Sequence, residues 1–343
     1  MLAAKRHGIV NICSGIATTP DYPHLAQRLF NVPLAITPEK LEIMMAALAN
    51  RFGLARLTRA DGEIVLLDAD YDAGEPAQER PYEVFEGIAV IPVQETLLAK
   101  LGILHPYSGM TGYDGIRANL AMALADDTVR AIVLDIDSPG GEVAGCFDLT
   151  DAIYATRGVK PLHAILTENA FSAAYALASA CDTVVVPRTG GTGSIGVIVA
   201  PEDFSKALAA AGITVTLITY GSRKADVNDV QPLSNDARAR IQSDVDAVGE
   251  LFVATVARNR NLTPAKVCAT EGLTYLGGAG FDIGLADAVM APDAALLAVM
   301  GELQTSMIAR TTTIRTSPVT MTTAARASAD ARRGARPGRC RRR

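Results

Sequence analysis

The stretch VRAIVLDIDSPGGEVAGCFDLTDAIYATRGVKPLHAILTE, residues 129–168, decides the fold class. Residues 129–141 form an apolar run that predicts a buried strand running into a tight turn at Ser-Pro-Gly-Gly, where the two glycines open a helix. Residues 142–158 have the pattern of a helix, and residues 161–168 form a second apolar run. A strand, a helix and a strand in succession predict a crossover connection between two parallel strands.

The same alternation continues on both sides of this stretch. We expect strands at 85–93, 181–187 and 213–221, and helices at 113–127, from near residue 172, and at 234–260. Residues 262–300 are a mixed end to the domain. Short strands that alternate with helices predict an α/β fold with a mainly parallel sheet.

Three regions differ in composition. Residues 1–80 predict a helical N-terminal region, because ITPEKLEIMMAALANRFG has a cap residue, a proline at the first turn and a helical apolar stripe. Residues 81–303 hold the alternating pattern and predict the main domain. Residues 304–343 lack apolar periodicity and are rich in Thr, Ala and Arg, which predicts a disordered tail.

The charges divide between body and tail. The net charge is -5, yet residues 304–343 hold ten arginines and a single acid, Asp330. Such a tail could bind nucleic acid through phosphates, but a merely solvated tail is the simpler interpretation and nothing else in the sequence supports nucleic-acid binding. Apolar runs are too short for a membrane span, and we expect no signal peptide. The five cysteines are scattered without a CxxC pair, which argues against a disulfide framework and a zinc site.

Ser172 lies in ENAFSAAYALASACD, residues 168–182, before a run of small residues. Serine often caps a helix, and it can also be a nucleophile if a base and an oxyanion hole are close. All four histidines precede it in the chain: His7, His24, His105 and His163. Because His163 falls within a predicted buried strand, we interpret it as a core residue, and a Ser-His-Asp triad is poorly supported.

A lysine is the alternative base. Three lysines follow Ser172: Lys206, Lys224 and Lys266. Lys224 differs from the other two because it directly follows the predicted strand 213–221, where the ends of strands in open α/β sheets commonly build sites. A lysine acts as a base only if its surroundings lower its pKa, and an exposed loop lysine is the simpler interpretation of Lys224 alone.

Two glycine-rich loops complete the candidate residues. In DSPGG, residues 137–141, the pair Gly140–Gly141 would let a ligand approach the backbone closely and would present N–H groups to it. In TGGTGSIGVIV, residues 189–199, Ser194 could form a hydrogen bond with a neighbouring amine. Taken singly, each loop is more simply a structural turn.

The order of these motifs carries more information than any one of them. SPGG (138–141), the segment around Ser172, TGSIGV (192–197), GSRKAD (221–226) and EGLTYLGGAGFDIGLADAV (271–289) occur in series. Together they resemble the signal peptide peptidase A family of serine peptidases over roughly residues 85–295. This resemblance implies the Clp protease/crotonase fold, an α/β superhelix of repeated β-β-α units.

The resemblance also implies roles for six residues. Ser172 would be the nucleophile, Lys224 the general base and Ser194 the residue that orients the lysine. An oxyanion hole would be formed by the backbone at Gly141, with Gly140 beside it, and by the N–H of Ala173. The family's reaction needs no metal and no cofactor.

The N-terminal residues 22–53 are similar to phage and prophage members of the family, the prohead (capsid assembly) proteases. This similarity implies capsid and scaffold proteins as substrates, a homo-oligomeric ring, and a location inside assembling proheads in the host cytoplasm. Three alternatives stay open at this point. They are a soluble cellular signal-peptide or protein-quality peptidase, a non-catalytic assembly or scaffold protein on a peptidase fold, and a crotonase-type acyl-CoA enzyme.

Overall fold

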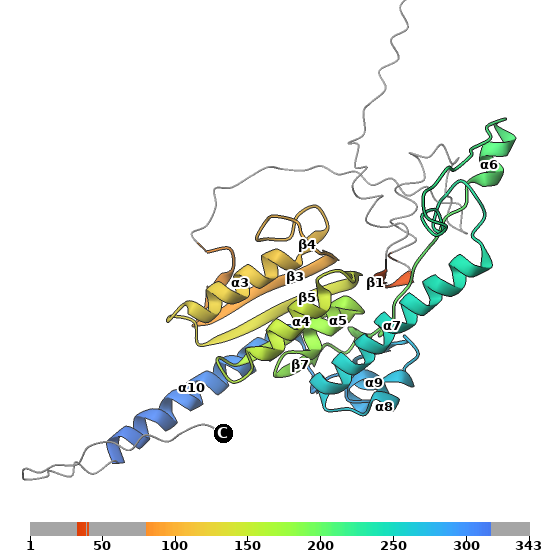
Figure 1. Ribbon diagram of the computed structural model, residues 1–343. Helices are drawn as coiled ribbons and strands as arrows, with labels where there is room; N and C mark the ends of the chain where they lie inside the picture. The colour runs from red at the N-terminus through yellow and green to blue at the C-terminus, as the bar shows by residue number, and fades with distance from the viewer. Residues whose placement is uncertain (1–32, 39, 41–79, 317–343) are drawn as a thin grey trace, which may run out of the picture. The chain divides into compact units, whose positions relative to one another are not determined.

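The computed structural model describes residues 33–38, 40 and 80–316, with side chains up to residue 305 (Figure 1). The chain divides into two compact units, residues 1–301 and 302–343, and the account below concerns the first. Most of the N-terminal region predicted to be helical, residues 1–80, and most of the predicted tail, residues 304–343, lie outside the described residues. In the part of the chain that is described, no helix is long and apolar enough to cross a membrane.

A six-stranded path forms the main sheet, in the order β10-β7-β6-β5-β3-β2. Its strands are β2 (Glu83–Phe85), β3 (Ile88–Leu98), β5 (Ala131–Glu142), β6 (Leu162–Phe171), β7 (Thr183–Val186) and β10 (Ala288–Val289). All neighbours on this path are parallel except β2 and β3. The prediction of an α/β fold with a mainly parallel sheet is therefore confirmed.

Four shorter strands pair with this sheet outside the main path. They are β1 (Leu34–Ile36), β4 (Met110–Gly112), β8 (Gly191–Gly193) and β9 (Thr274–Leu276). β4 runs parallel to β3 and β8 parallel to the end of β6, whereas β1 is antiparallel to the end of β5 and β9 to β8. β1 lies within the N-terminal region for which the sequence predicts helix, and three residues are too few to produce a periodic pattern.

Eight helices lie within the described residues. They are α3 (Tyr113–Ala125), α4 (Cys146–Ala155), α5 (Ala173–Ser179), α6 (Ser205–Ala210), α7 (Asn235–Arg260), α8 (Pro264–Cys268), α9 (Gly277–Asp282) and α10 (Pro292–Thr316). The helices predicted at 113–127 and 234–260 are confirmed as α3 and α7. The Ser234 side chain caps α7 by accepting a hydrogen bond from the Ala237 N–H at 3.1 Å.

The helix predicted over 142–158 begins later than expected. β5 continues through the two glycines to Glu142, and Gly145, with φ 82°, sets the start of α4 at Cys146. The Ser-Pro-Gly-Gly stretch is therefore the end of a strand and not a turn that opens directly into a helix. Its backbone groups remain free to pair with another extended segment.

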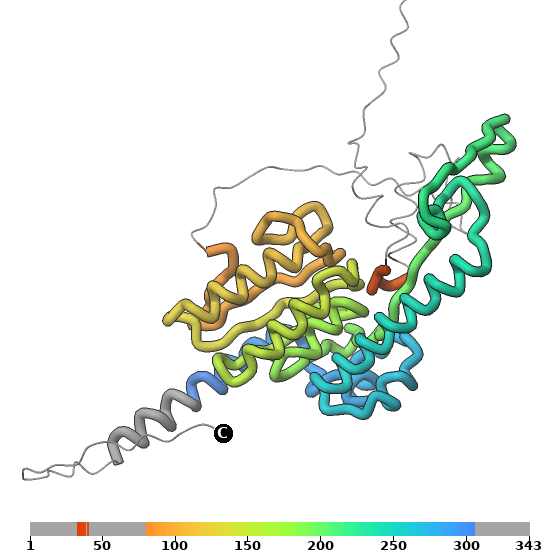
Figure 2. The backbone as a smooth tube through the Cα atoms, in the orientation of Figure 1, coloured from red at the N-terminus to blue at the C-terminus, as the bar shows by residue number. Residues whose placement is uncertain are grey.

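α5 is the most deeply buried helix in the described residues, and the chain's path from β6 through α5 to β7 can be followed in Figure 2. Every residue of AAYALAS is buried. The alanines let this helix approach β5, β6 and α4 closely. The small residues after Ser172 thus fix the helix and the strand end that precedes it in one rigid place.

The prediction of a strand at residues 213–221 is wrong. These residues have no assigned strand, and the side chains of Ile218 and Tyr220 are almost completely exposed. The apolar alternation is present in the sequence, but within the described residues no neighbouring strand pairs with the segment. Because a β-pattern forms a strand only where a partner supplies hydrogen bonds and burial, the segment stays irregular.

Candidate active site

Ser172 lies at the junction between β6 and α5 with a strained backbone. Its dihedral angles are φ 54° and ψ -119°, in a region that costs a non-glycine residue on the order of 1–3 kcal/mol. Its N–H donates to the Gly193 carbonyl at 2.9 Å, and its side chain is fully buried. The hydroxyl does not cap α5; Oγ lies 3.4 Å from the Gly196 carbonyl oxygen. A strained strand-to-helix turn of this kind is a common way to present a nucleophilic serine.

Gly140, near the end of β5, faces this serine, and Gly141 follows it in the same strand. Gly140 has φ 104°, and a Cβ placed on it would lie 3.0 Å from the Ser172 Cβ. A Cβ on Gly141 would overlap the backbone of Leu97. The Ser138 hydroxyl fixes the backbone just before the glycines. Its Oγ accepts a hydrogen bond from the Gly140 N–H at 3.2 Å and donates one to the Glu95 carbonyl at 2.5 Å. Only glycine fits at both positions, so the backbone itself lines the site next to Ser172.

Ser194 lies next to the same strand end. It directly follows β8, whose Gly193 is paired with Phe171, the residue before Ser172. Its backbone has φ 53°, its N–H donates to the Leu273 carbonyl at 2.8 Å, and its side chain is buried. The structure therefore brings Ser172, Ser194 and the two glycines together at one end of the parallel strands. Ala173 adds its N–H as the first residue of α5.

Lys224 is not part of this group. It is exposed, in a turn where its own N–H donates to the Gly221 carbonyl at 3.1 Å. Among the described residues, no hydrogen bond joins it to Ser172 or Ser194. The turn is held at the start of α7 by Asp226, whose carboxylate lies 3.2 Å from the Arg240 guanidinium. Within this chain, the predicted nucleophile and the predicted base are thus separate.

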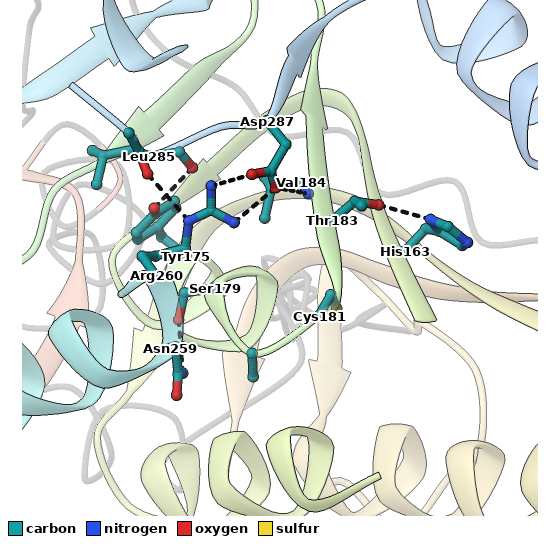
Figure 3. A network of polar contacts seen from close by, with 12 residues as sticks. His163, Tyr175, Ser179, Cys181, Thr183, Val184, Asn259, Arg260, Leu285 and Asp287 are labelled. Carbon is teal, nitrogen blue, oxygen red and sulfur yellow. Dashed lines mark hydrogen bonds and ion pairs between the residues drawn. The ribbon is translucent and has the colours of Figure 1, made fainter. Parts of the chain in front are cut away.

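His163 has a structural role. It lies on β6, and its Nδ1 is 2.7 Å from the Thr183 hydroxyl on β7 (Figure 3). The side chain is buried within the sheet, at the opposite end of β6 from Ser172. This agrees with the interpretation of His163 as a core residue.

Polar groups from the C-terminal part of the domain bind α5, and the sequence did not reveal them (Figure 3). The Tyr175 hydroxyl donates to the Leu285 carbonyl at 2.8 Å, and burial raises its pKa. At the other end of the helix, the Asn259 amide of α7 donates to Ser179 Oγ at 3.0 Å. These bonds tie the helix that follows the serine to segments distant in sequence. The sequence pointed to these bonds only through the Gly-Leu-Ala-Asp segment, residues 284–287. That segment is part of the family resemblance, but the resemblance assigned it no role.

Asp287, the acid of that segment, forms an ion pair in the same network. Its two carboxylate oxygens each accept a hydrogen bond of 2.8 Å from Arg260, and one of them also accepts from the Val184 N–H at 2.7 Å. Burial alone would raise the pKa of Asp287, but the hydrogen bonds and charge of Arg260 outweigh it and leave that pKa below its ordinary value. The pair joins α7 to β7 and to the segment before β10.

Arg157 closes the C-terminal end of α5. Its guanidinium donates to the carbonyls of Ala180 at 2.8 Å, Cys181 at 2.5 Å and Ser179 at 3.0 Å. A cation at a helix C-terminus satisfies carbonyls that lack a partner within the helix. Among the described residues, no three metal-ligating side chains gather in one place.

Comparison with known proteins gives the site its context. Residues 155–306 match the sequence profile of Peptidase family S49, a range that includes Ser172, Ser194 and Lys224. The chain is 41% identical over 271 residues to the head-tail preconnector protein GP5 of Enterobacteria phage P21, covering 77% of this chain and 54% of that protein. It is 40% identical over 275 residues to the capsid assembly protease C of Escherichia phage lambda, covering 78% of this chain and 63% of that protein.

A more distant similarity reaches cellular proteins. Protease 4 of Haemophilus influenzae is 24% identical over 233 residues, covering 67% of this chain and 37% of that protein. The chain thus spans between about half and two thirds of the length of the two phage relatives.

Proposed function

We propose, from the match of residues 155–306 to peptidase family S49, that the chain is a serine endopeptidase that cleaves capsid and scaffold proteins during the assembly of phage proheads. The similarity to a capsid assembly protease over most of the chain supports the biological setting. The observation that carries the chemistry is the position of Ser172, strained at a strand-to-helix junction and directly facing Gly140. This arrangement suits acyl transfer to a buried serine.

The proposed reaction forms an acyl-enzyme. Ser172 Oγ attacks the carbonyl carbon of the scissile bond while neutral Lys224 takes its proton. The N–H groups of Gly141 and Ala173 stabilise the oxyanion, each worth about 3 kcal/mol of transition-state stabilisation. The protonated lysine then gives a proton to the leaving amine, and water hydrolyses the ester. In this scheme Ser194 orients the lysine.

We further propose that the lysine comes from a neighbouring subunit of a homo-oligomeric ring. Two features of the subunit support this. Lys224 is exposed and apart from the buried Ser172. The segment 213–220 just before it exposes Ile213, Leu217, Ile218 and Tyr220, a pattern suited to pairing and burial against another copy. Docking of this segment beside a second subunit would bring the lysine to that subunit's serine and desolvate it.

The first experiment tests the nucleophile. The chain is co-expressed with a capsid protein and its scaffold, and both cleavage and labelling by a fluorophosphonate are measured. Ser172→Ala is expected to abolish both, whereas Ser243→Ala, at an exposed position on α7, should change neither. Undiminished cleavage by the Ser172→Ala protein would refute the proposed function.

The second experiment tests the shared site. Ser172→Ala and Lys224→Ala proteins are each expected to be inactive when purified alone. Mixed at equal amounts before assembly, they should recover activity, because about a quarter of the sites would combine an intact serine with an intact lysine from the neighbour. If mixing restores nothing while the wild-type protein is active, the lysine does not act between subunits.

A further inference from the structure

β1 lies along the end of β5 next to Ser172. This strand, Leu34-Ala35-Ile36, pairs antiparallel with the two glycines and Glu142 at the end of β5 (Figure 1). The pairing extends beyond the strand at both ends: the Thr37 N–H donates to the Pro139 carbonyl at 3.0 Å, and the Pro33 carbonyl accepts from the Val143 N–H at 3.4 Å. A segment that precedes the main sheet in sequence is therefore bound along the candidate active site.

The opposite edge of β1 is also paired. Leu34 and Ile198 exchange two backbone hydrogen bonds of 2.9 Å, and Ile198 lies in the glycine-rich stretch that contains Ser194. Leu34, Ala35 and Ile36 are all buried. Extended peptides bind in this way when they add a strand between existing backbone edges, with main-chain hydrogen bonds for affinity and side-chain pockets for specificity.

The register identifies one peptide bond in this segment. Ala35 lies opposite Gly141, and residues 33 and 37 on either side of it form the backbone bonds to β5. Hydrogen-bonded pairs recur at every second residue of an antiparallel ladder, so Ala35 and Gly141 also form a hydrogen-bonded pair. In such a pair the Gly141 N–H faces the Ala35 carbonyl. A Cβ on Gly140 would overlap that same carbonyl oxygen and lie 3.0 Å from the Ser172 Cβ. The Ala35 carbonyl and the Ser172 side chain thus both lie close to Gly140.

The glycines make this close approach possible. The φ of 104° at Gly140 and the absence of its side chain leave room for the Ala35 carbonyl. An ion pair of 3.0 Å between Lys40 and Glu95 holds the segment beyond the strand. The Glu95 carbonyl also accepts a hydrogen bond from Ser138. Glu95 therefore contacts both the segment after β1 and the turn that contains Gly140.

We propose that the Ala35–Ile36 peptide bond is a self-cleavage site of this chain, bound in the substrate groove before any other protein is cut. The proposal rests on the proposed function of Ser172. Ser172 Oγ attacks the Ala35 carbonyl carbon, the bond to the Ile36 nitrogen breaks, and that nitrogen takes a proton to become a new N-terminus. Water then hydrolyses the ester between Ser172 and Ala35, which releases residues 1–35 with a free carboxylate and frees the groove.

This geometry also predicts what the groove accepts. Ala35 is completely buried beside the glycine turn, so the residue before the cut must be small. Leu34 is buried as well, which favours an apolar residue at the preceding position. Because Lys224 lies apart from Ser172 in one subunit, the bond is expected to stay intact until subunits assemble.

The test compares full-length wild-type and Ser172→Ala proteins after assembly, by intact mass and N-terminal sequencing, and probes Ser172 separately with a fluorophosphonate. A new N-terminus at Ile36 is expected in the wild-type protein and not in Ser172→Ala. A synthetic peptide of residues 31–40, NVPLAITPEK, should be cut after its alanine by the processed wild-type protein. The same peptide with Ala35→Arg should be cut at least tenfold more slowly, and this comparison does not depend on folding of a variant.

The outcomes separate this inference from the proposed function. If Ser172 is labelled and capsid protein is cleaved, but the chain keeps residues 1–35 and the peptide is not cut after its alanine, β1 is only a structural strand and the self-cleavage site is refuted. If Ser172 is neither labelled nor needed for cleavage of any protein, the proposed function fails and the inference fails with it. A cut at another bond of the segment would refute the register argument.

Discussion

Removing the carboxylate of Asp287 tests whether the network behind α5 stabilises the fold. The Arg260 side chain is only 7% exposed and donates two hydrogen bonds of 2.8 Å to Asp287, whose side chain is 40% exposed. In Asp287→Ala, the guanidinium would remain buried without its partner, and the Val184 N–H would lose its acceptor. Breaking a buried pair by removing one member is strongly destabilising, because the other charge remains.

The magnitude follows from the three hydrogen bonds. A bond to a charged group contributes about 1.5–3 kcal/mol, so three independent bonds would exceed 4 kcal/mol. They are not independent, and water can reach the partly exposed position of Asp287 and replace some of them. We therefore expect a loss of about 3 kcal/mol in the free energy of unfolding, which corresponds to a decrease in Tm of about 6–12 °C for a domain of this size class.

Asp244→Ala is the matched control for this measurement. Asp244 also faces an arginine, Arg240 at 3.4 Å, but their side chains are 64% and 45% exposed on the surface of α7. Exposed pairs of this kind contribute less than about 1 kcal/mol. Thermal and denaturant unfolding of both variants gives the comparison. Equal losses for Asp287→Ala and Asp244→Ala would refute the assignment of a stabilising role to the buried network.

The pH dependence gives a second check on Asp287, using Asp287→Asn to keep the shape of the side chain. The pKa of Asp287 is lowered in the folded protein, so its ionised form stabilises the fold above the unfolded-state pKa of about 3.9. That contribution is lost as the pH falls through the lowered pKa. The stability difference between wild-type and Asp287→Asn proteins should therefore be constant near pH 7 and should shrink below about pH 4. A difference that grows in acid would contradict the direction of the shift.

Three further predictions concern the site and its surroundings. Burial raises the pKa of Cys146 to about 12, so iodoacetamide at pH 8 should label the exposed Cys268 and leave Cys146 unmodified in the folded protein; equal labelling would contradict its burial. Gly140→Ala should lose fluorophosphonate labelling and about 1–3 kcal/mol of stability, whereas Gly249→Ala, with open space on α7, should be neutral or slightly stabilising. Arg157→Ala should lower the free energy of unfolding by about 2–3 kcal/mol, measured by urea denaturation, because four carbonyls lose a charged donor; a change under about 0.5 kcal/mol would show that water replaces it.

The central strands and the long helix were predictable because their signals are local. β5 and β6 are apolar runs buried in the sheet, and α7 has a serine cap at its start and an asparagine in the left-handed conformation just after its end. In each case the residues that define the element lie within it. The position of Ser172 between a strand and a buried helix was predictable for the same reason.

Elements that depend on distant partners were not predictable. β1 is three residues long and is a strand only because the ends of β5 and residue 198 bind it. Residues 213–221 have the alternation of a strand but, in the described part of one subunit, no neighbour to pair with. The bonds of Asp287 to Arg260 and Val184 join three segments that no local pattern connects.

The two failures of local prediction have a common consequence for the proposed activity. Within this chain, β1 lies beside Ser172, and the proposed base follows residues 213–221, for which the described residues supply no pairing strand. A lone subunit would then be inactive for two separate reasons: it has no base at the serine and no room for a substrate. Assembly would remove the first restriction by bringing the lysine of a neighbour. Cleavage after Ala35 would remove the second immediately afterwards, because the bound strand is already in register with the glycines. Peptidase activity would thus appear in two steps: self-cleavage when residues 213–221 pair with a neighbouring subunit, and cleavage of other proteins once β1 has been cut.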